Sequence, residues 1–341
     1  FFRVRPWFEP GAWGGQWMKQ HIPGLNEEVP NLAWSFELMV LENGLMFESN
    51  GYRLEVSFDF LMYNDYRQVL GESADVFKTD FPIRFDFLDT MGGGNLSLQV
   101  HPITQYIRDT FGMAYTQDES YYLLDAQEGA TVFLGIKTGI DPEEMIAALY
   151  ESQKTGKKFD TEKYVNQWPA KKHDHFLIPA GTIHCSGAGA MVLEISATPS
   201  IFTFKLWDWG RLGLDGRPRP INIRHGANVI QWERQTDYTR RNLVNHVEKI
   251  AEGEGWYEER TGLHENEFIE TRRHWFTGKV LHHTGNSVNV LNVIEGDELI
   301  VESPDGAFEP FTVHYAETFI IPASINQYTI SPSAAAKNTA T

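Results

Sequence analysis

The sequence predicts a mainly β protein that contains two related β-barrels and a helical insertion. Many short apolar or alternating segments are separated by turns rich in Gly and Pro, which is typical of a sandwich or barrel and not of a parallel sheet. Residues 176–180 (FLIPA) resemble residues 319–323 (FIIPA), and each segment lies inside a β-rich block. Because 341 residues exceed one average hydrophobic core, two related barrels account for both observations.

The chain divides into four regions on this interpretation. They are a first barrel domain (1–235) with its helical insertion at about 141–168, a helical linker (236–267), a degenerate second barrel (268–331) and a disordered tail (332–341). The tail reads PSAAAKNTAT and has few apolar side chains to bury.

Periodicity and turn residues give the individual elements. Alternating or apolar runs predict strands at 52–61, 81–89, 96–101, 120–124, 131–137, 175–179, 189–196 and 203–207. The two runs around Gln127–Gly129 indicate a hairpin. Helical spacing and start signals predict helices at 103–112, 141–154, 161–168 and 238–251.

Composition excludes several classes of protein. A net charge of −17 would repel a phosphate backbone, so we expect no nucleic acid partner. No run of about 18 apolar residues is present, so we expect no membrane span. One cysteine, Cys185, allows no internal disulfide and favours the cytoplasm. No residue pattern indicates an oligomeric state.

Four residues form a candidate metal site. Alternate residues of a strand share a face, so Gln99 and His101 point the same way. His184 follows a tight Pro-Ala-Gly turn into the next predicted strand, and Glu119 stands at the start of another. Two imidazoles, a carboxylate and an amide oxygen suit one divalent metal, with Zn²⁺ the first choice among Mn²⁺, Fe²⁺, Co²⁺ and Ni²⁺. Any one of these residues alone is more often a hydrogen-bonded core or surface residue, so the prediction depends on their combination.

Other histidines are weaker candidates. His173 and His175 could form a metal-binding pair, but no third ligand stands at a suitable spacing, so we expect both to be solvated. His282 and His283 are adjacent, so on a strand they face opposite sides and do not share an ion.

Several segments resemble motifs of the class I mannose-6-phosphate isomerases, which belong to the cupin superfamily. They are LSLQVHP (96–102), IPAGTIH (178–184), MVLE (191–194), WDWGR (207–211), FPIRFDFLD (81–89) and AWGG (12–15), and their order holds over about residues 10–225. The resemblance implies two cupin (jelly-roll-like) barrels. It also implies an aldose–ketose isomerase that interconverts mannose 6-phosphate and fructose 6-phosphate.

The resemblance also implies roles for single residues. Gln99, His101, Glu119 and His184 occupy the metal-ligand positions of the family. Arg211 matches its active-site arginine, which we expect to stabilise negative charge. Glu194 is a candidate catalytic base, although a carboxylate that orients a ligand histidine or pairs with Arg211 is equally compatible with its position. Arg84 and Trp13 are predicted to bind the substrate, a sugar or sugar phosphate.

The chain departs from the family pattern at two lysine positions. Asp86 and Gln117 stand where the family has lysines of the substrate pocket. Arg84 either compensates for this loss or pairs with Asp86. Two alternatives follow, an isomerase of a non-phosphorylated sugar and a catalytically impaired sugar-binding cupin with a regulatory role. The second barrel lacks the metal histidine in its IPASIN turn (321–326), so we expect a metal-free barrel there.

Overall fold

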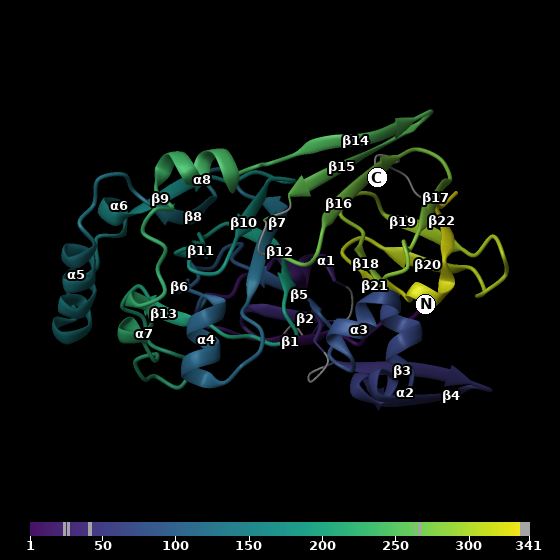
Figure 1. Cartoon of the computed structure of the whole chain (residues 1–341), viewed down its shortest axis with the longest axis horizontal. Coiled ribbons are helices and arrows are strands. Elements are labelled where there is room, and N and C mark those ends of the chain that lie inside the picture. The colour runs from purple at the N-terminus through teal and green to yellow at the C-terminus, as the bar shows by residue number, and fades with distance from the viewer. Residues whose placement is uncertain (23–24, 26–27, 40–42, 263, 265–266, 335–341) are drawn as a thin grey trace.

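The computed structural model describes residues 1–22, 25, 28–39, 43–262, 264 and 267–334 (Figure 1). Two β-rich units lie side by side along the long axis, and the prediction of a mainly β, two-barrel protein is confirmed. Every pair of neighbouring strands in the named sheets is antiparallel.

The first barrel consists of two sheets that face each other. The six-stranded sheet has the order β1 (Trp7–Glu9), β2 (Trp34–Leu38), β5 (Ile83–Asp89), β12 (Ala190–Ala197), β7 (Asp118–Ala126) and β10 (His175–Ile178). The five-stranded sheet has the order β13 (Phe204–Trp207), β6 (Leu98–Val100), β11 (His184–Ser186), β8 (Thr131–Ile136) and β9 (Val165–Pro169). A core that includes Leu88, Leu123, Val132 and Val192 fills the space between them.

The second barrel is smaller and carries a long ribbon. Its sheets are β17 (Val280–His283), β22 (Gln327–Pro332), β19 (Glu298–Glu302) and β20 (Phe311–His314), with the pair β18 (Asn289–Asn292) and β21 (Thr318–Ile321). The ribbon of β14 (Glu248–Gly253), β15 (Trp256–Gly262) and β16 (Thr271–Phe276) joins the two barrels in sequence, and its strands β14 and β15 run along the top of Figure 1.

One apolar layer joins the barrels. Phe87 of β5 and Leu193 of β12 point away from the first barrel and share a core with Val288 and Ile320 of the second. The N-terminal segment adds to this contact, because Phe2 exchanges two backbone hydrogen bonds with Ile320, at 3.1 and 3.0 Å. Phe1 also stacks on Phe311 with ring centroids 3.5 Å apart.

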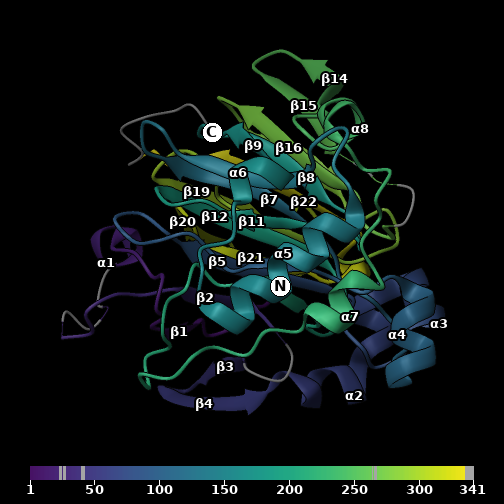
Figure 2. The same cartoon turned by 90° about the vertical axis from the view of Figure 1, so that its left-hand side faces the viewer.

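Helices cover the ends of the barrels. They are α1 (Trp17–His21), α2 (Phe58–Leu70), α3 (Ala74–Phe77), α4 (Thr104–Phe111), α5 (Pro142–Thr155), α6 (Thr161–Tyr164), α7 (Ile223–Ala227) and α8 (Thr236–Asn242). The side chain of Asp141 caps α5 by accepting from two backbone N–H groups. Figure 2 shows α5 and α7 on the face of the first barrel that lies away from the second. Among the described residues, no helix is long and apolar enough to cross a membrane.

Five predictions about single elements are wrong in part. The predicted hairpin at 120–137 is absent, because β7 and β8 belong to different sheets. The predicted helix at 161–168 ends at Tyr164 and continues as β9. The predicted strand at 52–61 is β4 (Tyr52–Ser57), paired with β3 (Gly44–Ser49), and its end is the start of α2. The predicted helix at 238–251, in the expected helical linker, is α8 followed by β14. The expected disordered tail begins inside β22, and its residues 335–341 lie outside the described residues.

Candidate metal centre and active site

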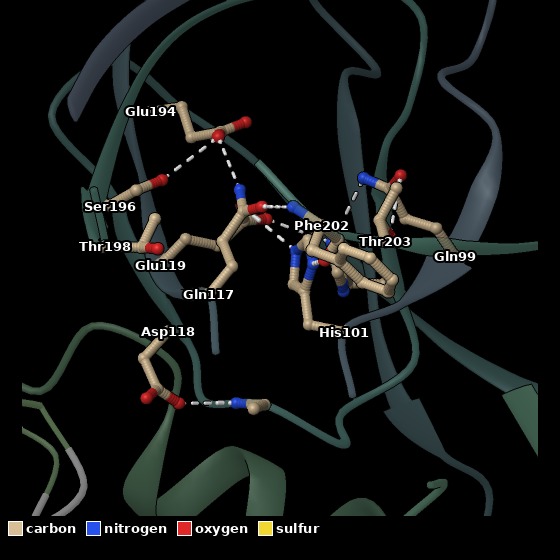
Figure 3. Close-up of polar contacts among 12 residues, drawn as sticks. Gln99, His101, Gln117, Asp118, Glu119, Glu194, Ser196, Thr198, Phe202 and Thr203 are labelled. Atoms are coloured by element: carbon tan, nitrogen blue, oxygen red, sulfur yellow. Dashed lines mark hydrogen bonds and ion pairs between the residues drawn. The ribbon is translucent and has the colours of Figure 1, made fainter. Parts of the chain in front are cut away.

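Three side chains from separate strands converge inside the first barrel. His101 follows β6, Glu119 lies on β7 and His184 opens β11. Nε2 of His101 is 3.1 Å from one carboxylate oxygen of Glu119, and Nε2 of His184 is 2.9 Å from the other. The three donor atoms all lie within 4.8 Å of one another, and each residue is at most 1% exposed. Figure 3 shows His101 and Glu119 pointing toward each other.

The outer ring nitrogens fix the orientation of both imidazoles. His101 Nδ1 donates to the carbonyl oxygen of Phe202 at 2.8 Å, and His184 Nδ1 donates to that of Thr182 at 2.9 Å. In the neutral tautomer each Nε2 then carries a lone pair that faces a carboxylate oxygen. Lone pairs at this distance repel each other unless a proton or a cation lies between them. This donor set therefore fits a zinc-class ion.

The charge of Glu119 is favoured despite its burial. Burial alone would raise the pKa of its carboxyl group, but His101 and His184 outweigh this effect and hold the pKa well below its usual value. A carboxylate that stays ionised in the interior is a suitable anionic ligand for a metal ion.

Gln99 joins the same group. Its Nε2 is 3.2 Å from Nε2 of His184, and its Oε1 accepts a hydrogen bond from Thr203 Oγ1 at 3.3 Å. A rotation of the amide by 180° would present its oxygen to the centre, and the two orientations have the same shape. The structure thus brings together all four predicted ligands.

A glycine turn connects two of the ligand segments. Gly181, in the left-handed region at φ 87°, donates its backbone N–H to the carbonyl oxygen of His101 at 2.9 Å. Arg234 donates to the carbonyl oxygens of Pro179 and Ala180 at 2.9 and 2.6 Å, and Asp118 accepts from the N–H of Ala180 at 2.7 Å. Sequence reasoning missed Arg234 and Asp118, because neither belongs to a motif that marks a turn anchor.

Two rows of side chains cross the wall of the barrel beside this centre. The strand registers place Glu119, Ser196 and Arg84 in one row and Tyr121, Glu194 and Asp86 in the next, on strands β7, β12 and β5. Neighbouring strands lie about 4.8 Å apart, so Arg84 is roughly 10 Å across the wall from Glu119.

Glu194 is linked to the metal centre through Gln117. The amide nitrogen of Gln117 donates to Glu119 at 2.7 Å and to Glu194 at 3.2 Å, and Ser196 donates to Glu194 at 3.1 Å (Figure 3). Burial, followed by the negative charge of Glu119, raises the pKa of Glu194 well above its usual value. Within the described residues, no contact joins Glu194 to Arg211 or to a ligand histidine. Both alternative roles considered for Glu194 are therefore unsupported.

Arg84 pairs with Asp86 in the interior. The two side chains are 2% and 4% exposed and form an ion pair. Arg84 also keeps two buried nitrogens, Nε and Nη1, that find no hydrogen-bond acceptor among the described residues. The ion pair with Asp86 therefore uses only some of the N–H donors of the Arg84 guanidinium.

Arg211 belongs to a basic cluster that adjoins Gln99. Arg211 and Arg219 both contact the carboxylate of Asp208, at 2.6 and 2.8 Å, and Arg219 also reaches Ser97 Oγ at 3.5 Å. Lys205 lies directly across the strand pair from Gln99. Burial, and then the charge of Arg219, lowers the pKa of Lys205. Two guanidinium groups thus contact one carboxylate, and the charge of this carboxylate also acts on Lys205.

Two other residues singled out in the sequence are buried. Trp13 is 1% exposed and packs edge-on against Trp34 with centroids 4.7 Å apart, and its contact with a substrate stays a prediction. His175 is fully buried, with Nδ1 donating to the carbonyl oxygen of Thr261 at 2.9 Å, and is not a solvated loop histidine.

Comparison with known proteins points to one family. The chain is 28% identical over 221 residues to a mannose-6-phosphate isomerase of Streptococcus mutans, a match that covers 64% of each protein. The mannose 6-phosphate isomerase of Bacillus subtilis has the same fold, with a TM-score of 0.78, 19% identity and 97% and 96% of the two chains covered. A zinc-bound mannose 6-phosphate isomerase gives a TM-score of 0.71 at 14% identity, with 97% and 96% covered. No family model matches the chain.

The sequence match and the fold agree with the motif resemblance. The matched region spans less than two thirds of the Streptococcus relative, whereas the structural match extends over both barrels. The motifs at 96–102 and 178–184 supply the converging ligands Gln99, His101 and His184. The chain is therefore similar to the mannose-6-phosphate isomerases in its motifs and in part of its sequence, and it shares their fold.

Proposed function

We propose that this protein is a zinc-dependent isomerase that interconverts mannose 6-phosphate and fructose 6-phosphate. The observation that carries the proposal is the convergence of His101, Glu119 and His184 inside the first barrel. Gln99 completes the proposed ligand set. The family relationship and the zinc in a structural neighbour agree with it.

The reaction moves a proton between C1 and C2 of the sugar. Zinc, when bound, supplies Lewis-acid polarisation of a carbonyl oxygen. Glu194 is the group that we assign to carry the proton, because its carboxylate lies one strand from Glu119 on the interior wall. Gln117 and Ser196 hold this carboxylate in place by donating to the same oxygen. A base fixed by two donors is already oriented before the substrate arrives.

The phosphate of the substrate would bind at the basic cluster. Lys205, Arg211 and Arg219 carry three positive charges against the single carboxylate of Asp208. A dianionic phosphate is attracted by the net positive charge that remains. Because Lys205 lies opposite Gln99 in the strand pair, the cluster is close to the metal centre. This arrangement would replace the two pocket lysines that the chain lacks at Asp86 and Gln117, and it gives Arg211 an electrostatic role.

Arg84 would bind hydroxyl groups of the sugar. Its two unsatisfied nitrogens are buried donors, and leaving such donors without an acceptor is unfavourable. Asp86 neutralises the guanidinium, so we assign Arg84 to uncharged oxygens and leave the phosphate to the basic cluster.

We also propose that the protein works in the cytoplasm. The single cysteine, Cys185, is buried and allows no internal disulfide. This agrees with a reducing compartment.

A coupled assay for fructose 6-phosphate tests the proposal. Formation from mannose 6-phosphate should be lost after treatment with a chelator and restored by Zn²⁺. Arg219→Ala should raise KM for mannose 6-phosphate at least tenfold and leave the zinc content unchanged. Activity that survives complete removal of metal would contradict the mechanism, and faster turnover of free mannose would contradict the phosphate assignment.

A further inference from the structure

A second polar group containing two histidines lies outside the active site. His274 of β16 faces Glu258 of β15 as a direct cross-strand partner, and His282 of β17 faces Tyr328 of β22 in the same way. All four residues line one cavity of about 690 Å³ that extends from the second barrel to the outer face of the first. The two cross-strand pairs come from different sheets and meet at this cavity.

The two imidazoles of this group are as close as those of the first metal centre. The ring centroids of His274 and His282 are 4.5 Å apart, compared with 4.9 Å for His101 and His184. Nε2 of His274 is 3.3 Å from Oε1 of Glu258. The group thus repeats the composition of the first centre, which is two imidazoles and one glutamate.

Both histidines hold ring nitrogens without a partner. His282 is 7% exposed, and its Nε2 finds no hydrogen-bond partner among the described residues. The buried Nδ1 of His274 also finds none, but it points away from Nε2, which faces Glu258, so Nε2 is the nitrogen that His274 offers to an ion beside Glu258. The ring of His282 is fixed by stacking on Tyr328, with centroids 5.3 Å apart and planes 14° apart. A buried imidazole nitrogen with no partner is unfavourable unless a ligand satisfies it.

We propose that Glu258, His274 and His282 form a second binding site for a zinc-class divalent ion. Imidazole nitrogen with a single carboxylate is the ligand set that such ions prefer. In the first centre the three donor atoms all lie within 4.8 Å of one another. The donor atoms of Glu258, His274 and His282 are farther apart than this. To complete the site, the side chain of Glu258 would have to rotate and turn Oε2 toward the two histidines, because its ion pairs with His274 and Arg272 both use Oε1.

An ion at this position joins the ribbon to the second barrel. Glu258 and His274 belong to the ribbon of β14–β16, whereas His282 belongs to the sheet of the barrel. The site is distinct from the IPASIN turn, where the second barrel lacks a metal histidine. The ring of His274 lies 4.5 Å from that of His282, centroid to centroid, so the proposed site does not use the adjacent His283.

Metal titration of the chelator-treated protein tests the proposal. With Co²⁺ or Zn²⁺ we expect two equivalents in the wild type, measured by calorimetry and by Co²⁺ absorption. His282→Phe keeps the stacking on Tyr328 and should lower the affinity for one equivalent at least tenfold. Glu258→Gln, on the partly exposed ribbon, should weaken the same equivalent. His314→Gln, an exposed histidine of the same barrel that contacts Glu298 and Glu317, is the control and should still bind two.

A variant of the first centre separates this proposal from the proposed function. His184→Gln should lose the isomerase activity and one equivalent but retain the equivalent that depends on His282. Retention of the first equivalent by His282→Phe shows that this variant is folded. A wild type that binds one equivalent, or a His282→Phe protein that still binds two with unchanged affinity, overturns the second site. Absence of isomerase activity in the metal-loaded wild type would instead contradict the proposed function alone.

Discussion

Gln117 lies between two carboxylates, at a position where the motif resemblance implies a lysine. Gln117 donates to Glu119 and Glu194 with one amide nitrogen, and its own oxygen accepts from the backbone N–H of Phe202 at 3.0 Å. A neutral amide positions both carboxylates without adding a charge. The negative charge of Glu119 therefore stays available to a metal ion, and Glu194 experiences it fully.

Removing the carboxylate of Glu194 should abolish turnover without releasing the metal. We expect Glu194→Gln to lower kcat by about 10²- to 10⁴-fold, the usual contribution of a positioned acid–base group. KM should change little, and the zinc content should equal that of the wild type. Steady-state kinetics with metal analysis checks this.

Ser196→Ala is the matched control for Glu194. It removes one of the two donors to the carboxylate and should lower kcat much less, because Gln117 still holds the group. A Glu194→Gln enzyme with nearly normal kcat would assign the proton transfer to another residue.

At the scale of an element, the turn at Gly181 fixes the relative position of two predicted metal ligands. Gly181 binds the carbonyl of His101 and lies three residues before His184, so its backbone conformation sets the relation between two ligands. A Cβ at this position would meet Gln231 Cγ at 2.5 Å and the carbonyl oxygen of Val229 at 2.9 Å. An L-residue is in addition strained at φ 87°.

Gly181→Ala should therefore weaken both folding and metal binding. We expect a loss of at least about 1 kcal/mol in the free energy of unfolding and a roughly tenfold lower zinc affinity. Urea unfolding and competition with a chelator measure the two effects. Gly129→Ala, also at positive φ but with no atom within 4 Å of its Cβ, should reduce stability and leave zinc affinity unchanged. Equal zinc affinities in Gly181→Ala and the wild type would contradict this role of the turn.

Sequence patterns identified the elements that carry the ligands. Alternation on a strand fixes which residues share a face, so the sequence alone was enough to place Gln99 and His101 together. The prediction of one helix over 238–251 is wrong, because the apolar residues Leu243, Val244 and Val247 suit a helix as well as a strand. Pairing with β15 decides the outcome for β14, and this tertiary contact leaves no local signal. Arg234 donates to Thr182, which lies 52 residues earlier in the chain. A local motif cannot reveal this contact either, because it too forms only in the folded protein.

At the scale of the whole molecule, a buried carboxyl group lies near the contact between the two barrels. Glu37 is 3% exposed and accepts a hydrogen bond from Ser35. Burial first, and then the charges of Asp86 and of Glu317 in the second barrel, raises its pKa from 4.5 to about 8. The folded protein therefore keeps this carboxyl protonated at pH values where the unfolded chain ionises.

This shift makes the stability of the protein fall with rising pH. Between pH 4.5 and about 8 the folded state binds one more proton than the unfolded state at Glu37, so its contribution is present in full below pH 4.5 and declines as pH rises through this window. The slope is at most about 1.4 kcal/mol per pH unit. Glu37→Gln keeps the neutral shape and should flatten this dependence.

Urea unfolding of the wild type and Glu37→Gln at pH 5 and pH 8 measures the difference. The variant should gain stability relative to the wild type at pH 8 and differ little at pH 5. Glu55→Gln, with its side chain 43% exposed, is the control and should follow the wild type at both values. Parallel pH curves for Glu37→Gln and the wild type would show that Glu37 ionises normally in the folded protein.

The pairing of Phe2 with Ile320 has a consequence for protein synthesis. The ribosome makes Phe2 318 residues before Ile320, which at about 5–20 residues per second is a delay of roughly 15 to 60 s. During this interval Phe1 lacks the ring of Phe311 and Phe2 lacks its backbone partner, although most of the first barrel has already left the ribosome. The segment that contains Phe2 can therefore reach its final position only after β21 has emerged.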